Sequence, residues 1–121
     1  MTASPRHIST ELAILGTGLA GTAAAVYAGN RNISCVLAGN TGALVYTTGH
    51  LDLLGLPGEA FIEQPWEGLA QLRQLQPHHP LCTVEAEDIE ESFRQYTRFL
   101  TENGINYSNP GRENLFVPTP T

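Results

Sequence analysis

Two short apolar segments near the start of the chain flank a segment rich in alanine. Residues 12–15 and 33–37 have the length and character of buried strands, and the alanines between them favour a helix. Gly29 and Asn30 end the helical pattern, since glycine tolerates a left-handed conformation at a helix end. The order strand, helix, strand, with a short connection before the second strand, predicts two parallel strands of an α/β fold.

Two later segments carry apolar residues at helical spacing. Residues 66–75 and 86–103 are predicted to be helices, and Gly104 ends the second one. Residues 76–80 read as a loop, and residues 105–107 as a short strand. We expect the two apolar stripes to pack rather than to act in function; they consist of Trp66, Leu69, Leu72 and Leu75, and of Ile89, Phe93, Tyr96 and Leu100.

A glycine-rich motif joins the first strand to the first helix. It reads Gly16, Thr17, Gly18, Leu19, Ala20 and Gly21, a G-x-G-x-x-G pattern that follows a strand and opens a helix. The first glycine would allow a sharp turn, the second a close approach of backbone N–H groups to a diphosphate, and the third close packing of helix on sheet. The helix amino end carries partial positive charge, so we predict that these six residues, the glycine turn, bind a nucleotide or a flavin.

Two other interpretations of this segment stay open. Glycine patterns of this kind also occur by chance. A targeting segment is the second alternative, because residues 12–30 carry no charge, Arg6 precedes them, and residues 27–29 resemble a cleavage site. The three glycines and many alanines make a poor apolar core for such a peptide, and the segment is too weakly apolar to span a bilayer.

The end of the second strand bears on the type of cofactor. An acidic residue there would accept a hydrogen bond from an adenosine ribose, but this chain has Ala38, Gly39 and Asn40. A dissociable NAD is therefore disfavoured, whereas a flavin stays open. Asn40 or Thr41 could offer a neutral hydrogen bond to a ribose.

Composition narrows the function classes further. The chain has 41% hydrophobic residues and a formal net charge of −6, which disfavours binding of nucleic acid or of anionic lipid. Its two cysteines, Cys35 and Cys82, cannot hold an iron–sulfur cluster, so such a cluster would belong to a partner. His78 and His79 lie between prolines, and we interpret them as loop residues rather than metal ligands.

The whole pattern resembles the family of the B subunit of anaerobic glycerol-3-phosphate dehydrogenases. The resemblance spans about residues 12–107, and residues 47–54, which read Thr-Thr-Gly-His-Leu-Asp-Leu-Leu, are its most specific part. Further matches are the glycine turn, Ala43 with Leu44, Gly68 with Leu69, Leu72 with Arg73, His79 with Pro80, and the helix end at Glu102, Asn103 and Gly104.

The resemblance implies a flavoprotein of the FAD/NAD(P)-binding, Rossmann-like α/β type. It implies a flavin, FMN rather than FAD, with Thr47, Thr48 and Gly49 as flavin contacts and no role for His50. It also implies a respiratory complex in which sn-glycerol 3-phosphate is oxidised to dihydroxyacetone phosphate. A sister flavin subunit and an iron–sulfur subunit that passes electrons to quinone would be the partners. The chain itself would not span the membrane; it would be cytoplasmic, peripheral on the inner face of the cell membrane through these partners.

The resemblance also bears on domain organisation. We expect residues 1–10 to be a disordered tail and residues 11–121 to be the amino-terminal part of a truncated flavin- or dinucleotide-binding domain with an incomplete sheet and additional helices. The unpaired sheet edge offers a route to self-association. A nicotinamide-dependent dehydrogenase domain and a non-catalytic assembly module of the same fold are the alternatives. No residue is assigned a catalytic role, and we expect the chain alone to be inactive.

Overall fold

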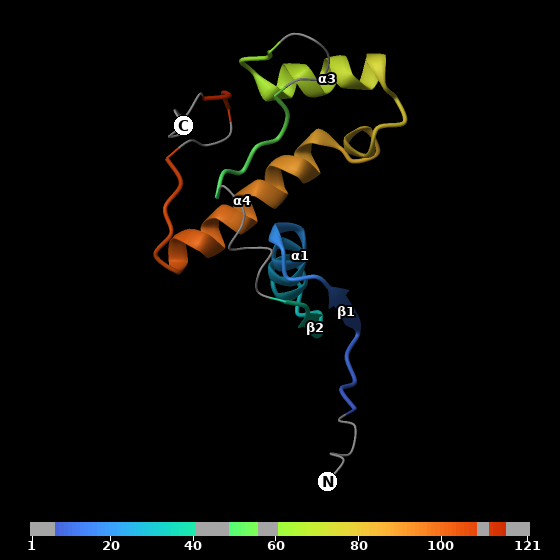
Figure 1. The fold of residues 1–121 in the computed structure, drawn as a ribbon, viewed down its shortest axis with the longest axis vertical. Helices are drawn as coiled ribbons and strands as arrows, with labels where there is room; N and C mark the ends of the chain where they lie inside the picture. The colour runs from blue at the N-terminus through green and yellow to red at the C-terminus, as the bar shows by residue number, and fades with distance from the viewer. Residues whose placement is uncertain (1–6, 41–48, 56–60, 109–111, 116–121) are drawn as a thin grey trace. The chain divides into compact units, whose positions relative to one another are not determined.

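A computed structural model describes residues 7–40, 49–55, 61–108 and 112–115 of the chain (Figure 1). The elements follow in the order β1, α1, β2, α3, a short 3₁₀ helix and α4. They fall into two compact units, residues 1–48 and residues 49–121.

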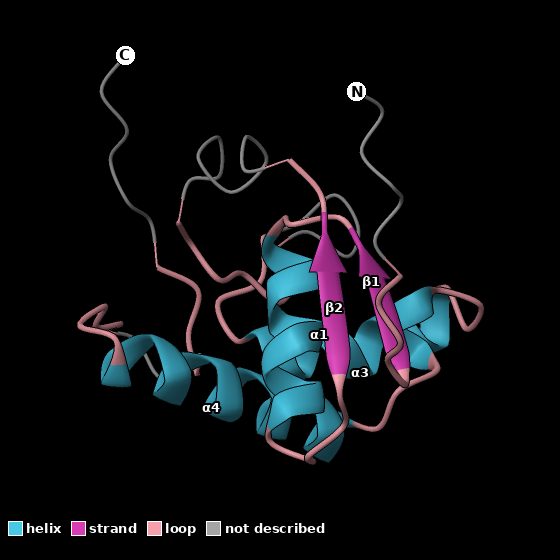
Figure 2. Cartoon of the chain, turned by 90° about the horizontal axis from the view of Figure 1, so that it is seen from below, coloured by secondary structure: helices cyan, strands magenta, loops and turns pink. Residues whose placement is uncertain are grey.

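The first unit has the strand–helix–strand order that the sequence predicts. Strand β1 spans Leu12–Leu15, helix α1 spans Leu19–Gly29, and strand β2 spans Cys35–Ala38. The two strands pair in parallel, with Leu12 opposite Cys35 and Leu15 opposite Ala38. In Figure 2, α1 lies against one face of this pair. The second strand begins two residues later than predicted, because Ile33 and Ser34 still belong to the connection.

The prediction of a left-handed residue at Gly29 is wrong. Helix α1 ends at Gly29 with Asn30 as a right-handed cap, and the positive φ of 56° falls on Asn32. Asparagine is one of the few side chains that tolerate this conformation. The chain therefore reverses two residues later than the glycine suggested, and the N–H of Ile33 donates to the carbonyl of Ala28 at 3.0 Å.

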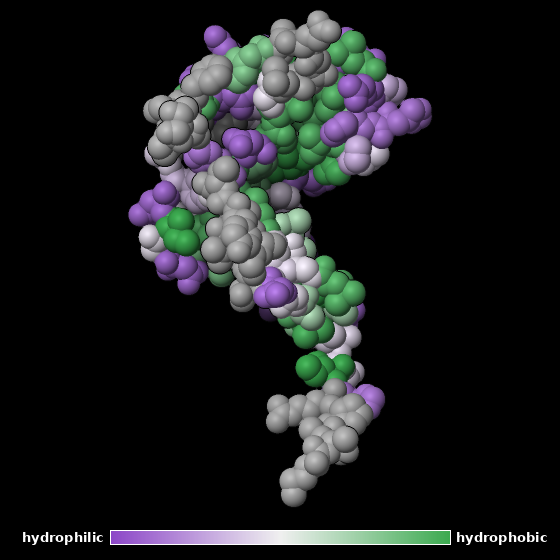
Figure 3. All heavy atoms as spheres, in the orientation of Figure 1, coloured by the Kyte–Doolittle hydropathy of each residue, from purple (hydrophilic) through white to green (hydrophobic). Residues whose placement is uncertain are grey.

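The expectation of a buried first strand is also wrong. Adjacent strand residues point to opposite faces of a sheet. Ile14 is half-buried, whereas the side chain of Leu15 is 87% exposed. The reason is that α1 covers one face of the two-stranded sheet, and no other described part of this unit covers the second face. Figure 3 accordingly shows hydrophobic side chains on the surface of the part that holds β1.

The second unit is helical. Helix α3 spans Pro65–Leu75, the 3₁₀ helix spans Pro80–Cys82, and helix α4 spans Ala86–Glu102. Leu69, Leu72 and Ile89 form its buried core. Proline at the first position of α3 suits a helix start, because its missing N–H has no partner there in any helix.

Most of the predicted apolar stripes pack as expected. Tyr96 is buried with Ile89 in α4, and Phe93 packs against the core. Leu75 does not follow the prediction: its side chain is 65% exposed, because it lies in the last turn of α3, beyond the core. Gly104 has a φ of +85° and ends α4 as predicted. Residues 105–107 form no strand.

Candidate functional site

The glycine turn has the geometry that the sequence predicts. Strand β1 ends at Leu15, Gly16 follows with a φ of +113°, and Gly18 is the amino cap of α1. Leu19, Ala20 and Gly21 form the first turn of the helix, in which Leu19 is half-buried and Ala20 is exposed. The turn therefore connects a parallel strand directly to a helix amino end.

Two of the glycines are required by the fold itself. Gly16 has a backbone conformation that other residues adopt only with strain. A Cβ on Gly21 would lie 1.9 Å from the carbonyl oxygen of Gly16 and 3.5 Å from Cδ1 of Leu37. Gly21 thus lets α1 approach both the turn and β2.

Gly18 differs from these two glycines. Its φ of −75° and ψ of −174° are extended backbone angles that any residue adopts. The conformation therefore gives no reason for a glycine at this position. Close approach of a ligand to the backbone N–H groups gives one.

The amino end of α1 is suited to an anion. No side chain of the described residues caps it, and its first turn holds no acidic residue. The sequence has no Lys, Arg, Asp or Glu at positions 12–30 or 32–51. An anion at this end would be held by backbone N–H groups and the helix dipole rather than by a salt bridge.

The residues after β2 lie against the glycine turn. The N–H of Gly16 donates to the carbonyl of Ala38 at 2.7 Å, and the Thr17 hydroxyl donates to the carbonyl of Asn40. A Cβ on Gly39 would lie 2.8 Å from the backbone nitrogen of Thr17. The structure thus brings Asn40 to the turn through its main chain. Gly39 is a site residue that sequence reasoning missed, because its closeness to Thr17 depends on how strand and turn pack.

The other predicted contacts are placed less completely. Thr41, Thr47 and Thr48 lie outside the described residues. Gly49 belongs to the second unit, where it has a φ of +77° and its carbonyl accepts a hydrogen bond of 2.5 Å from the hydroxyl of Tyr107. Tyr107 was not foreseen from the sequence, since 58 positions separate it from Gly49.

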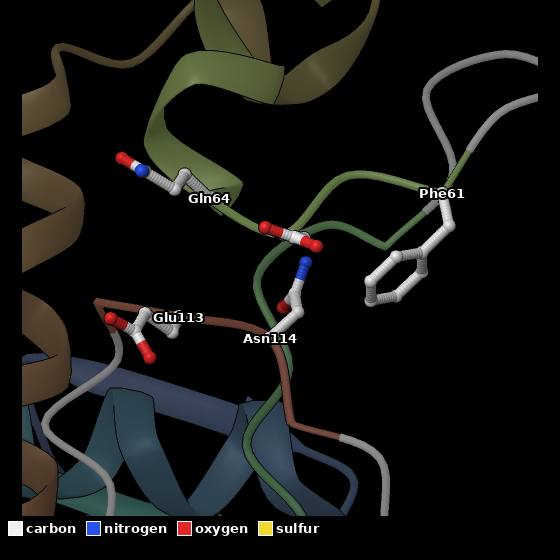
Figure 4. Close-up of a pocket in the computed structure, with 5 residues that line it drawn as sticks. Phe61, Gln64, Glu113 and Asn114 are labelled. Carbon is white, nitrogen blue, oxygen red and sulfur yellow. The ribbon is translucent and has the colours of Figure 1, made fainter.

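The second unit also has a shallow hollow of about 290 Å³ (Figure 4). The side-chain nitrogen of Asn114 donates to the carbonyls of Leu54 and Ile62 at 2.8 and 2.7 Å. These bonds fasten residues 112–115 to the segment before α3. None of the predicted cofactor contacts lines the hollow; its lining consists of Phe61, Glu63, Gln64, Glu113 and Asn114.

Among the described residues, no group of three or more His, Cys, Asp or Glu side chains could hold a metal ion. His79 has a local role, because its Nδ1 accepts the N–H of Leu81 at 3.2 Å. None of the described helices is both long and apolar enough to cross a membrane.

Comparison with known proteins agrees with this geometry. Residues 11–121 match the family described as FAD binding domain. The description supports a flavin cofactor and gives no support to the expectation of FMN over FAD. Together with the parallel strand pair, the match confirms the predicted Rossmann-like α/β fold. No solved structure matches the chain.

Several curated relatives are named as the B subunit of anaerobic glycerol-3-phosphate dehydrogenase, which confirms the resemblance noted from the sequence. The protein of Vibrio cholerae is 34% identical over 74% of this chain, and that of Haemophilus influenzae is 30% identical over 76%. The protein of Pectobacterium carotovorum is 29% identical over 91% of the chain. The aligned part is 21–27% of the length of these relatives, so the chain spans about a quarter of them.

Proposed function

The chain belongs to the FAD binding domain family, and on that premise we propose that its glycine turn holds the diphosphate of FAD in a flavin-dependent dehydrogenase. The observation that carries the proposal is the uncapped amino end of α1 directly after β1. Gly18 at that end has a backbone conformation that does not itself call for glycine.

FAD suits this turn better than FMN does. A helix amino end with several unpaired N–H groups can bind both phosphates of a dinucleotide, whereas FMN has a single phosphate. The residues that would hold the cofactor are those of the glycine turn, with Asn40, Thr41, Thr47, Thr48 and Gly49 as further predicted contacts. When bound, the flavin supplies an acceptor for two electrons from an alcohol or a similar donor.

The proposed reaction is the oxidation of sn-glycerol 3-phosphate to dihydroxyacetone phosphate. It is supported by the relatives that are named as the B subunit of anaerobic glycerol-3-phosphate dehydrogenase. Oxidation of the alcohol releases two electrons and two protons; the electrons would pass by way of the flavin and an iron–sulfur partner to a quinone, which would take up two protons from the solvent on reduction. A sister flavin subunit and the iron–sulfur subunit are the proposed partners, and they would hold the protein at the inner face of the cell membrane.

The alternative of a nicotinamide cosubstrate is weaker because the chain belongs to a family described as FAD binding domain. The end of β2 does not separate the two cofactors, since NAD and FAD carry the same adenosine ribose and this chain has Ala38, Gly39 and Asn40 there instead of an acidic residue. The space beside Thr17 leaves no room for such a residue at Gly39. An assembly module that has lost its cofactor remains the other alternative, and cofactor binding separates it from the proposal.

Equilibrium titration with FAD, FMN and NAD⁺ tests the proposed function. The flavins are followed by fluorescence and NAD⁺ by calorimetry. We expect FAD to bind at least tenfold more tightly than FMN, which corresponds to about 1.4 kcal/mol for the second phosphate and the adenosine together. Equal binding of FAD and FMN would argue against a diphosphate site. Tighter binding of NAD⁺ than of either flavin would favour the nicotinamide alternative.

A further inference from the structure

We propose that the side chain of Thr17 positions the glycine turn and is not itself a ligand of the phosphates. Its hydroxyl fastens the turn to the chain just after β2 and so sets the direction of the turn's backbone N–H groups. The expected effect of Thr17 on FAD binding rests on the proposed function. The structural part of the inference, that the Thr17 hydroxyl holds the turn in place, can be tested without any cofactor.

Thr17 lies close to Gly39 and Asn40, the two described residues that directly follow β2. A Cβ built on Gly39 would lie 2.8 Å from the backbone nitrogen of Thr17 and 3.1 Å from both Cγ2 and Oγ1. The backbone nitrogen, the methyl group and the hydroxyl of Thr17 therefore all lie close to Gly39. One residue earlier, the N–H of Gly16 donates to the carbonyl of Ala38 at 2.7 Å.

The hydrogen bond of Thr17 decides what its hydroxyl can do. A hydroxyl has one proton to donate, and that of Thr17 goes to the carbonyl of Asn40. A phosphate oxygen accepts hydrogen bonds and needs donors. While the bond to Asn40 is made, Thr17 has no hydroxyl proton left for a phosphate. Its contribution to anion binding therefore runs through the position of the backbone.

The chain offers a matched control at the opposite end of the same strand pair. The hydroxyl of Thr10 donates to the carbonyl of Ser34 at 2.7 Å, just before β1 and β2 begin. The two threonine–carbonyl bonds span 24 and 23 positions of the chain. They have the same chemistry and join the same two segments, but only the bond of Thr17 lies in the glycine turn.

The test compares Thr17→Val with Thr10→Val in the full chain. Valine keeps the shape of threonine and removes the hydroxyl, so each variant loses its bond to a carbonyl of the other segment, and Thr10→Val also loses the 3.3 Å contact between the hydroxyls of Thr10 and Ser34. We expect similar falls in melting temperature. We expect Thr17→Val to weaken FAD binding about tenfold, the upper range for one lost hydrogen bond, and Thr10→Val to change it less than twofold. Thr17→Ser, which keeps the hydroxyl, should restore most of the affinity. Equal affinities of the two valine variants for FAD would overturn the inference.

A measurement without cofactor separates this inference from the proposed function. In the ligand-free chain, amide hydrogen exchange at Gly16 reports on its bond to Ala38. We expect exchange at Gly16 to be at least tenfold faster in Thr17→Val than in Thr10→Val. If the unmodified chain does not bind FAD, the proposed function fails, and this exchange result alone decides whether Thr17 fastens the turn. Equal exchange rates would mean that it does not.

Discussion

The α-carbon of Gly21 faces the carbonyl oxygen of Gly16 so closely that an added Cβ would lie 1.9 Å from that oxygen. Both residues belong to the glycine turn, and neither atom is part of a flexible side chain that could move aside. The contact fixes how far α1 can lie from the end of β1. It also explains why this position requires glycine whether or not a cofactor is bound.

Gly21→Ala should destabilise the first unit by about 1–3 kcal/mol, the usual cost of overpacking. Urea denaturation followed by circular dichroism measures the change. Gly29→Ala is the control on the same helix, because nothing lies within 4 Å of a Cβ at Gly29. Alanine there should be neutral or stabilising by up to about 1 kcal/mol. Equal stability of Gly21→Ala and Gly29→Ala would contradict the close contact between Gly21 and the carbonyl oxygen of Gly16.

Gly18→Val should weaken FAD binding and keep the fold. The backbone angles of Gly18 suit valine, so the expected loss of stability is about 1 kcal/mol or less, from a poorer helix cap. The branched side chain would block the approach of phosphate to the N–H groups, and we expect at least a tenfold rise in the dissociation constant for FAD. Ala24→Val, on an exposed position of α1, controls for a valine in this helix. Unchanged FAD affinity of Gly18→Val would speak against the phosphate site.

Gly49→Ala should be destabilising although nothing crowds the position. The cost comes from the φ of +77°, which is worth about 1–2 kcal/mol for a residue with a Cβ. Gly55→Ala is the control. A Cβ at Gly55 would lie in open space, as at Gly49, but Gly55 has no positive φ. Thermal melting of both variants measures the difference.

Tyr107→Phe should lower the stability of the second unit by about 0.5–1.5 kcal/mol, because it removes the hydrogen bond from the Tyr107 hydroxyl to the carbonyl of Gly49.

Leu72→Ala should lower the stability of the second unit by about 2–5 kcal/mol, because the side chain of Leu72 is only 2% exposed in the core of this unit. Leu75→Ala, one turn later on α3, should change it by less than about 0.5 kcal/mol because Leu75 is 65% exposed. Chemical denaturation of the two variants side by side checks this. A large effect at Leu75 would mean that a partner or another part of the chain covers it.

The sequence was most informative where local chemistry decides the structure. The positions of the glycines predicted the turn between β1 and α1, and the apolar spacing predicted α3 and α4. Gly104 ended α4 as expected because a left-handed residue at a helix end is a local requirement.

The sequence was least informative where the answer depends on packing between distant segments. The exposure of Leu15 follows from what covers the sheet, and the strand pattern alone says nothing of that. The bonds from Tyr107 to Gly49 and from Asn114 to Leu54 join residues 58 and 60 positions apart. The left-handed residue after α1 is Asn32 and not Gly29. Both asparagine and glycine can adopt this conformation, so the local sequence does not tell which of the two positions adopts it.

The central claim is that the backbone of the glycine turn binds the diphosphate of FAD. Titration of the ¹⁵N-labelled chain with FAD, followed by nuclear magnetic resonance, tests it most directly. We expect the amides of Gly18, Leu19 and Ala20 to shift most, and to saturate together with the flavin fluorescence. The claim is contradicted if these amides stay in place at about 1 mM FAD, where even a ligand held by only about 4 kcal/mol is half-bound, or if the shifts appear only elsewhere in the chain.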